Sequence, residues 1–331
     1  MYHDKYNHDT KRVKFLFVLP PQVKAFANGL KKYYIMGMNT MKTWFLATRP
    51  WSFAMSLISV GVGAAWAGDY GVSWFWLILT AIALVCIHGA ANLTNDYFDY
   101  KNKVDVPDAP TTKYRPHPLA QNLLTLHEVK WFALTLFAVG IVLGLVMAAA
   151  KGWPLILVGA AGIFIAVAYT APPIALKYHA LGEPMVFLCW GPLAIQGAYF
   201  VQTGAFSLPL LLVSAPFGAL VSLVLLANNL RDAEFDRRQG ISTIPVRFGG
   251  RSGRLLFAGL IALSFGGVAV MAIFGPLPIW SLAVLLALPL AWPMFKMVSQ
   301  DIPDDADAQT ARLDTVFGVL LLASLVLEHV L

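Results

Sequence analysis

Cysteine is scarce in this sequence, and the two cysteines that occur lie far apart. Cys86 and Cys189 both stand inside long apolar runs, and no Cys-x-x-Cys pair or mixed cysteine and histidine spacing surrounds them. This pattern excludes the usual zinc and iron-sulfur motifs, so we expect both to be small packing residues. The seven histidines form no His-Glu-x-x-His motif, and nothing in the sequence supports a serine, cysteine or histidine nucleophile.

Charged residues are also few. They make up 13% of the 331 residues, whereas 58% are hydrophobic, and the mean hydropathy is +0.66. Such a chain carries more apolar surface than a soluble core of this length can bury, so the composition predicts an integral membrane protein.

Long apolar runs are what the sequence has in abundance. A membrane-spanning helix needs about 20 mostly apolar residues, whereas barrel strands need about ten alternating ones. The candidate spans lie near residues 51–68, 73–94, 130–150, 153–172, 184–202, 208–229, 254–275, 278–298 and 312–330. We therefore expect an all-α fold, a bundle of about nine transmembrane helices.

The positive charges predict the orientation of this bundle. Of the 24 Lys and Arg residues, only Lys151 falls on the opposite side of the membrane from the rest. Because cytoplasmic loops carry the excess of Lys and Arg, we expect the N-terminus to be cytoplasmic, in a plasma or inner membrane. This bias and the attraction of membrane lipids account for the net charge of +6, so no nucleic acid partner is needed.

The first 44 residues differ from the rest in composition. They are basic and contain only a short apolar run, Phe15 to Pro20, which is too brief to span a membrane and precedes no cleavage site. We expect residues 1–44 to be a poorly ordered extension, and residues 45–331 to form the transmembrane domain.

Two polar clusters stand at the ends of apolar segments that are expected to be cytoplasmic. The first cluster consists of Asn92, Asn95, Asp96, Asp99 and, beyond them, Asp105; the second consists of Asn228, Arg231, Asp232 and Asp236. Residues three or four apart share one face of a helix, so each helix end presents several oxygen ligands together. Such ligands suit Mg²⁺, which carboxylates commonly hold together with substrate phosphates. Two facing clusters predict a cradle for a diphosphate.

These clusters have other interpretations. The carboxylates could merely solvate the helix ends, or the chain could belong to another class of membrane protein. The spacing from Asn92 to Asp96 recurs from Asn228 to Asp232, which indicates two related halves, as in many transporters. A membrane cation transporter, however, needs polar groups near the bilayer midplane, whereas the two clusters of this chain stand at one edge of the membrane. A CDP-alcohol phosphotransferase needs one contiguous acidic motif, which neither cluster provides.

Several motifs occur in a characteristic order. They are Asn95 to Lys101 with Asp105, Tyr169-Thr170, Lys177-Tyr178, Leu181-Gly182-Glu183, Gly191-Pro192, Asn228 to Asp236, and Gly240 to Gly249. Over residues 45–330 the chain thus resembles the UbiA superfamily of intramembrane aromatic prenyltransferases. Within it, the chain most resembles the branch that prenylates 1,4-dihydroxy-2-naphthoate on the way to menaquinone, a quinone.

The resemblance implies roles for particular residues. Asn92, Asp96, Asp99, Asp105, Asn228, Asp232 and Asp236 would hold two Mg²⁺ ions on the diphosphate of a polyprenyl donor. Arg49, Asn95, Lys113, Arg115, Lys177 and Arg231 would contact the diphosphate or the aromatic acceptor. Tyr169 would shield the allyl cation with its ring, with Tyr97, Tyr178 and Tyr199 as further candidates.

The expected chemistry follows the movement of charge. Breaking the allylic bond from carbon to oxygen places negative charge on the diphosphate, so metal ions and fixed cations stabilise the transition state. A dihydroxynaphthoate ring that attacks at the carbon bearing its carboxylate then loses carbon dioxide, which requires no strong protein base. A 4-hydroxybenzoate acceptor, which loses a ring proton instead, stays the alternative.

Two stretches bear on the choice of acceptor. Gly240 to Thr243 lacks the lysine that is usual in the naphthoate branch, and Arg238 or Arg247 is the candidate replacement. Arg115-Pro116-His117-Pro118-Leu119 resembles the hydroxybenzoate relatives. For the donor chain, small residues such as Gly140, Gly144 and Gly159 either open a groove between helices or serve helix packing.

Overall fold

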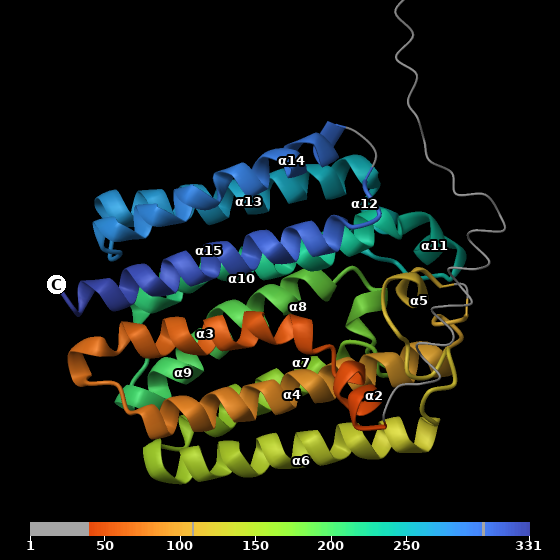
Figure 1. The fold of residues 1–331 in the computed structure, drawn as a ribbon, viewed down its shortest axis with the longest axis horizontal. Helices are drawn as coiled ribbons and strands as arrows, with labels where there is room; N and C mark the ends of the chain where they lie inside the picture. Colours follow the sequence, from red (N-terminus) through yellow and green to blue (C-terminus); the bar gives the residue numbers. More distant parts are fainter. Residues whose placement is uncertain (1–39, 108, 300–301) are drawn as a thin grey trace, which may run out of the picture. The chain divides into compact units, whose positions relative to one another are not determined.

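The computed structural model describes residues 40–107, 109–299 and 302–331 (Figure 1). Residues 43–331 form one compact unit. The predicted extension, residues 1–44, lies outside the described residues except for Thr40 to Trp44, which belong to helix α2. Its boundary stays a prediction.

The described residues form helices and no β-strand, which confirms the all-α prediction. In chain order they are α2 Thr40–Ala47, η1 Pro50–Ser52, α3 Phe53–Trp66, η2 Gly68–Tyr70, α4 Trp74–Lys101, α5 Pro110–Tyr114, α6 Leu126–Lys151, α7 Pro154–Ala168, η3 Leu176–Tyr178, α8 Gly182–Leu188, η4 Cys189–Leu193, α9 Ala194–Thr203, α10 Leu208–Arg231, α11 Ala233–Arg238, α12 Ile244–Phe248, α13 Gly250–Phe274, η5 Ile279–Ala287, α14 Leu288–Ser299 and α15 Ala306–Glu328.

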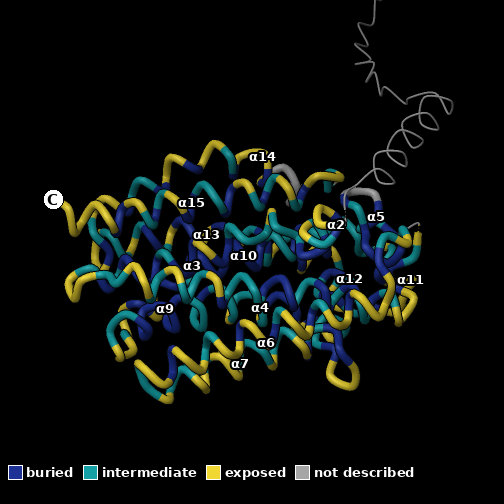
Figure 2. Tube along the Cα trace, turned by 60° about the horizontal axis from the view of Figure 1, so that its bottom comes forward, coloured by how far each residue is buried: buried dark blue, intermediate teal, exposed yellow. Residues whose placement is uncertain are grey.

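Every predicted span coincides with helical structure. Six helical stretches in the described part of the chain are long and apolar enough to cross a membrane: α4, α6, α8 to α9, α10, α13 and α15. α7 and the run from η5 into α14 are shorter apolar helices, and α3 has 14 residues. Exposed positions follow the outer helices α6, α7 and α14 in Figure 2, and many are large hydrophobic side chains such as Val142 and Trp292. Apolar surface of this extent belongs in lipid, so the chain is an integral membrane protein.

Helix α10 lies at the centre of the main hydrophobic core. Of its most apolar window, 72% is buried, including Phe217, Leu220 and Leu223. It packs against α13, α15 and α8. Helix α10 is therefore held by packing along most of its length.

Some neighbouring helices approach so closely that only glycine fits between them. A Cβ atom on Gly63 of α3 would lie 2.3 Å from the backbone oxygen of Ile195 in α9. A Cβ atom on Gly218 of α10 would lie 2.9 Å from the backbone oxygen of Phe187 in α8. Small residues at such crossings let membrane helices pack backbone to backbone.

The C-terminal ends of α4 and α10, which carry the polar clusters, lie at the same end of the bundle as α5, α11 and α12 (Figure 1). The connection between α7 and α8 also reaches this end, where His179 forms an isolated β-bridge with Ser242. This bridge joins the α7–α8 connection to the segment that follows the second polar cluster.

Candidate active site

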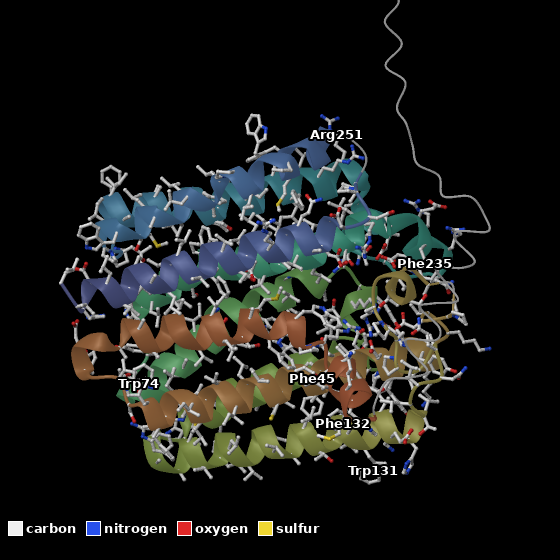
Figure 3. All side chains as sticks on the ribbon, in the orientation of Figure 1. Phe45, Trp74, Trp131, Phe132, Phe235 and Arg251 are labelled. Atoms are coloured by element: carbon white, nitrogen blue, oxygen red, sulfur yellow. The ribbon has the colours of Figure 1, made fainter. Side chains whose placement is uncertain are left out.

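A cavity of about 1330 Å³ has both polar clusters in its lining. From the first cluster these lining residues are Asn92, Asn95, Asp99 and Asp105, and from the second Asn228, Arg231, Asp232 and Asp236. Nitrogen and oxygen atoms gather at the end of the bundle that bears Phe235 and Arg251, far from Trp74 (Figure 3). The structure therefore brings together two clusters that are more than a hundred residues apart in the sequence.

Asp96 is held by two arginines. Its carboxylate is fully buried and accepts two hydrogen bonds from Arg115, at 2.6 and 3.1 Å. Arg49 donates to the same carboxylate and, at 3.3 Å, to Asn95 Oδ1. Burial alone would lower the pKa of Arg49, but the neighbouring Asp96 raises it above its ordinary value. Both guanidinium groups stay charged and compensate Asp96.

Asp99 is compensated by a lysine. Lys177 Nζ lies 2.7 Å from Asp99 Oδ2, and the hydroxyl of Tyr178 donates to Oδ1 at 2.6 Å. Burial would lower the pKa of Lys177, but Asp99 raises it above its ordinary value, so the ammonium group is kept. Tyr178 is thus a hydrogen-bond donor to the first cluster.

Asp105 is positioned by His117, which was not among the predicted site residues. His117 is fully buried, and its Nδ1 accepts hydrogen bonds from the backbone N–H groups of Leu119 and Ala120. The proton therefore lies on Nε2, which donates to Asp105 Oδ2 at 2.9 Å. Ligand atoms of Asp96, Asp105 and His117 lie within 4.8 Å of one another. In the sequence, the signal for this residue is the proline on each side.

The second cluster is organised around Arg231. Its guanidinium binds both oxygens of Asp232, at 2.8 and 2.9 Å, and Asn228 Oδ1 at 2.8 Å. It also donates to Asp307 at 2.8 Å. Asp307 stands at the start of α15 and lines the cavity with Asp304 and Asp305. This acidic run is visible in the sequence but was not among the predicted site residues.

Asp236 shows that the two clusters interact. The pKa of Asp236 is raised to about 7, first by burial and then by the negative charges of Asp232 and Asp99, against the lowering effect of Lys177. Carboxylates from both clusters therefore converge closely enough to repel one another. A divalent cation between them would relieve this repulsion, so the donor set fits Mg²⁺ with oxygen ligands.

The other predicted site residues are distributed as follows. Asn92 lines the cavity and donates to the backbone oxygen of Thr48 at 2.9 Å. The side chain of Lys113 lies outside the described part of the chain. Arg238 and Arg247 bind the backbone oxygens of Glu234 and His179, and neither is among the described residues that line the cavity.

Tyr169 is the predicted cation shield that faces the cavity. Of the four candidate tyrosines, all of them in the described chain, Tyr169 lines the cavity and Tyr97, Tyr178 and Tyr199 do not. Tyr199 belongs to the hydrophobic core instead.

Away from the clusters the cavity is lined by apolar side chains and glycines of α4, α6, α7 and α9. At Gly144 and Gly159 an added Cβ atom would meet nothing within 4 Å, whereas at Gly140 it would lie 2.5 Å from Ile87 Cδ1. Gly144 and Gly159 therefore open the groove, and Gly140 serves packing. The cavity suits a molecule with an anionic head and a long apolar chain.

Comparison with known proteins agrees with this geometry. The UbiA prenyltransferase family matches residues 56–320. A UbiA prenyltransferase domain-containing protein 1 homolog of Drosophila melanogaster is 31% identical over 300 residues, which cover 87% of this chain and 80% of that protein. A 1,4-dihydroxy-2-naphthoate octaprenyltransferase of Bacillus subtilis is 28% identical over 288 residues, or 85% of this chain and 91% of the relative.

The fold is also similar to solved structures. One is a UbiA homolog from Archaeoglobus fulgidus bound to GPP and Mg²⁺, with a TM-score of 0.64. It is 15% identical, and the match covers 86% of this chain and 99% of that one. At this identity the likeness shows a common arrangement of helices.

Proposed function

The chain belongs to the UbiA prenyltransferase family, and from this premise we propose that it transfers a polyprenyl group from polyprenyl diphosphate to 1,4-dihydroxy-2-naphthoate in menaquinone biosynthesis. The observation that carries the proposal is the single cavity with both polar clusters at one end and an apolar groove beyond them. The similarity to a dihydroxynaphthoate octaprenyltransferase favours this acceptor. A membrane cation transporter is not supported, because the family is one of prenyltransferases.

The polar end supplies two kinds of contact for the donor diphosphate. Arg49, Arg115, Lys177 and Arg231 are fixed cations that line the cavity. Mg²⁺ would be held by the carboxylates of Asp99, Asp105, Asp232 and Asp236 and by the amide oxygens of Asn92 and Asn228. Asp96 would hold Arg49 and Arg115 in place until the diphosphate binds these arginines or a metal ion binds Asp96. Bound Mg²⁺ would neutralise the charge that develops on the diphosphate.

The acceptor reaction then needs little from the protein beyond position. As the allylic bond breaks, its electron pair leaves with the diphosphate, and the ring of Tyr169 faces the cationic carbon. The naphthoate ring supplies the pair for the new bond between carbons. Loss of carbon dioxide returns electrons to the ring and restores its aromaticity. The apolar lining excludes the water that would otherwise capture the cation.

The excess of Lys and Arg on one side supports a cytoplasmic position for the polar end, in a plasma or inner membrane. Both the soluble aromatic acid and Mg²⁺ would then enter from the cytoplasm, and the prenyl chain from the bilayer.

The first test is a competition between acceptors. Purified protein in detergent receives Mg²⁺, geranylgeranyl diphosphate, 1,4-dihydroxy-2-naphthoate and 4-hydroxybenzoate, and mass spectrometry identifies the product. We expect a decarboxylated prenyl naphthoquinol. Prenyl hydroxybenzoate would instead favour the alternative suggested by Arg115 to Leu119.

The second test addresses the two clusters. Asp96→Ala and Asp232→Ala should each lower Mg²⁺-dependent turnover by about 100-fold or more, because Asp232 lines the polar end of the cavity and Asp96 holds Arg49 and Arg115, which also line it. The melting temperature should change little in Asp232→Ala and should fall in Asp96→Ala, which leaves the buried Arg115 without its carboxylate. Asp69→Asn is the matched control, since the Asp69 side chain is 83% exposed and lies outside the cavity lining. Full turnover in both alanine variants would refute the two-cluster site.

A further inference from the structure

His88 is a buried histidine that the proposed reaction does not use. It lies on α4 one turn before Asn92, on the same face of the helix. It is 6% exposed and belongs to the lining of the cavity. Its ring meets the edges of Phe53 and Trp190, with centroid distances of 5.5 and 4.8 Å. The side chain is therefore tightly held beside the site.

Both ring nitrogens of His88 are hydrogen-bonded to serines of the neighbouring segment. Nδ1 lies 2.8 Å from Ser56 Oγ, and Nε2 lies 3.2 Å from Ser52 Oγ. Ser56 also accepts a hydrogen bond from Trp190 Nε1 at 3.1 Å. We refer to Trp190, Ser56, His88 and Ser52 as the relay.

The hydrogen-bond partners fix the direction of every proton in the relay. The hydroxyl of Ser52 donates to the backbone oxygen of Arg49 at 2.8 Å, so Ser52 Oγ can only accept from His88 Nε2. In the neutral imidazole, Nδ1 of His88 then lacks a proton and accepts from the hydroxyl of Ser56. Trp190 N–H is a donor only. With Nε2 as the protonated nitrogen, all protons point from Trp190 toward the carbonyl of Arg49.

The end of the relay is a strained residue. Arg49 has φ 58° and ψ 58°, in the left-handed region that non-glycine residues avoid. Its carbonyl also accepts from the backbone N–H of Ser52 at 3.0 Å. Its side chain leaves this turn to reach Asn95 and Asp96. The conformation of this one turn decides where the guanidinium lies.

We propose that His88 is a positioning residue for Arg49. Through Ser52 it holds the left-handed turn, which keeps the Arg49 guanidinium at the polar end of the cavity where the donor diphosphate binds. Ser52 also accepts a hydrogen bond from Asn92 at 3.3 Å, so the relay fixes the first cluster against the same turn. The inference rests on the proposed function, because it assumes that Arg49 contacts the diphosphate.

The test compares two substitutions of His88. His88→Leu removes both hydrogen bonds, whereas His88→Gln keeps one acceptor and one donor at a similar separation. Binding of geranylgeranyl diphosphate with Mg²⁺ is measured on the full chain in detergent. We expect the affinity to fall about tenfold or more in His88→Leu, a typical effect of removing an orienting partner, and to be restored by His88→Gln. His127→Leu, at an exposed position on α6, is the control that should bind normally.

A double-mutant cycle shows whether the effect passes through Arg49. If it does, His88→Leu weakens donor binding in the wild-type background and adds no further loss in Arg49→Ala. Independent losses that multiply would overturn the inference. So would normal donor binding by His88→Leu.

Ser52→Ala provides a second way to break the relay if His88→Leu fails to fold. It should weaken donor binding as His88→Leu does, and an unaltered affinity would also overturn the inference. The wild-type measurement separates the two proposals. A wild-type protein that binds no donor contradicts the proposed function, whereas normal wild-type binding with no effect of His88→Leu or Ser52→Ala contradicts the inference alone.

Discussion

At the scale of single residues, the aspartates of the site were predictable and their partners were not. Repeated spacing at the ends of apolar segments singled out Asp96, Asp99, Asp232 and Asp236, and the last three line the cavity. The groups that pair with them come from distant segments: Lys177 is 78 residues from Asp99, and Asp307 is 76 residues from Arg231. Such contacts depend on how helices pack, which local spacing does not encode.

Another residue-scale feature is Asp314 on α15, which is fully buried and has no hydrogen-bond partner for either oxygen among the described residues. A buried polar group without a partner destabilises the fold by about 1–3 kcal/mol. We expect Asp314→Val to raise the melting temperature in detergent without loss of transferase activity. Asp314→Asn, which keeps the polarity, should show no such rise. A lower melting temperature in the valine variant would mean that the carboxyl group is stabilised after all.

At the scale of elements, the long helices were predicted well and the irregular ones were not. Hydropathy located every span, because a run of about 20 apolar residues has few alternatives to a helix in lipid. The predicted span at 184–202, however, contains the π-helical turn Cys189–Leu193 with Pro192 inside it. Proline has no N–H to donate, and the local ladder shifts to accommodate it. The short helices α5, α11 and α12 lack a hydropathy signal altogether.

The crossing of α3 and α9 gives an element-scale prediction. A Cβ atom at residue 63 would lie 2.3 Å from the Ile195 backbone oxygen and 2.8 Å from Ala198 Cβ, so the two helices would have to separate. We expect Gly63→Ala to destabilise the protein by about 1–3 kcal/mol, measured as a lower melting temperature in detergent. Gly259→Ala on α13 meets nothing within 4 Å and should be neutral or stabilising. Equal behaviour of the two variants would contradict the close crossing.

At the scale of the whole molecule, the cavity passes from a polar end to an apolar groove, and its length limits the donor. Gly144 lines the apolar part with open space around it. We expect Gly144→Phe to retain turnover with geranyl diphosphate and to lose most of it with longer donors, because the ring occupies the path of the chain. Turnover is measured with donors of increasing length. Gly266→Phe, at an exposed position on α13, should leave the preference unchanged, and a shift there would point to a general effect on the bundle.

The charge pairs described above have a consequence for the order of events at the site. A divalent ion at Asp99 would compete with Lys177 for the carboxylate, and one at Asp232 would compete with Arg231. A buried cation without a partner is costly, but an arriving diphosphate offers the released cations new oxygens. On the proposed function, metal and donor therefore increase each other's affinity, and this coupling is reciprocal. When the diphosphate leaves, Lys177 would pair again with Asp99, and Arg231 with Asp232. The aspartates would thus serve as counter-ions for these cations between turnovers.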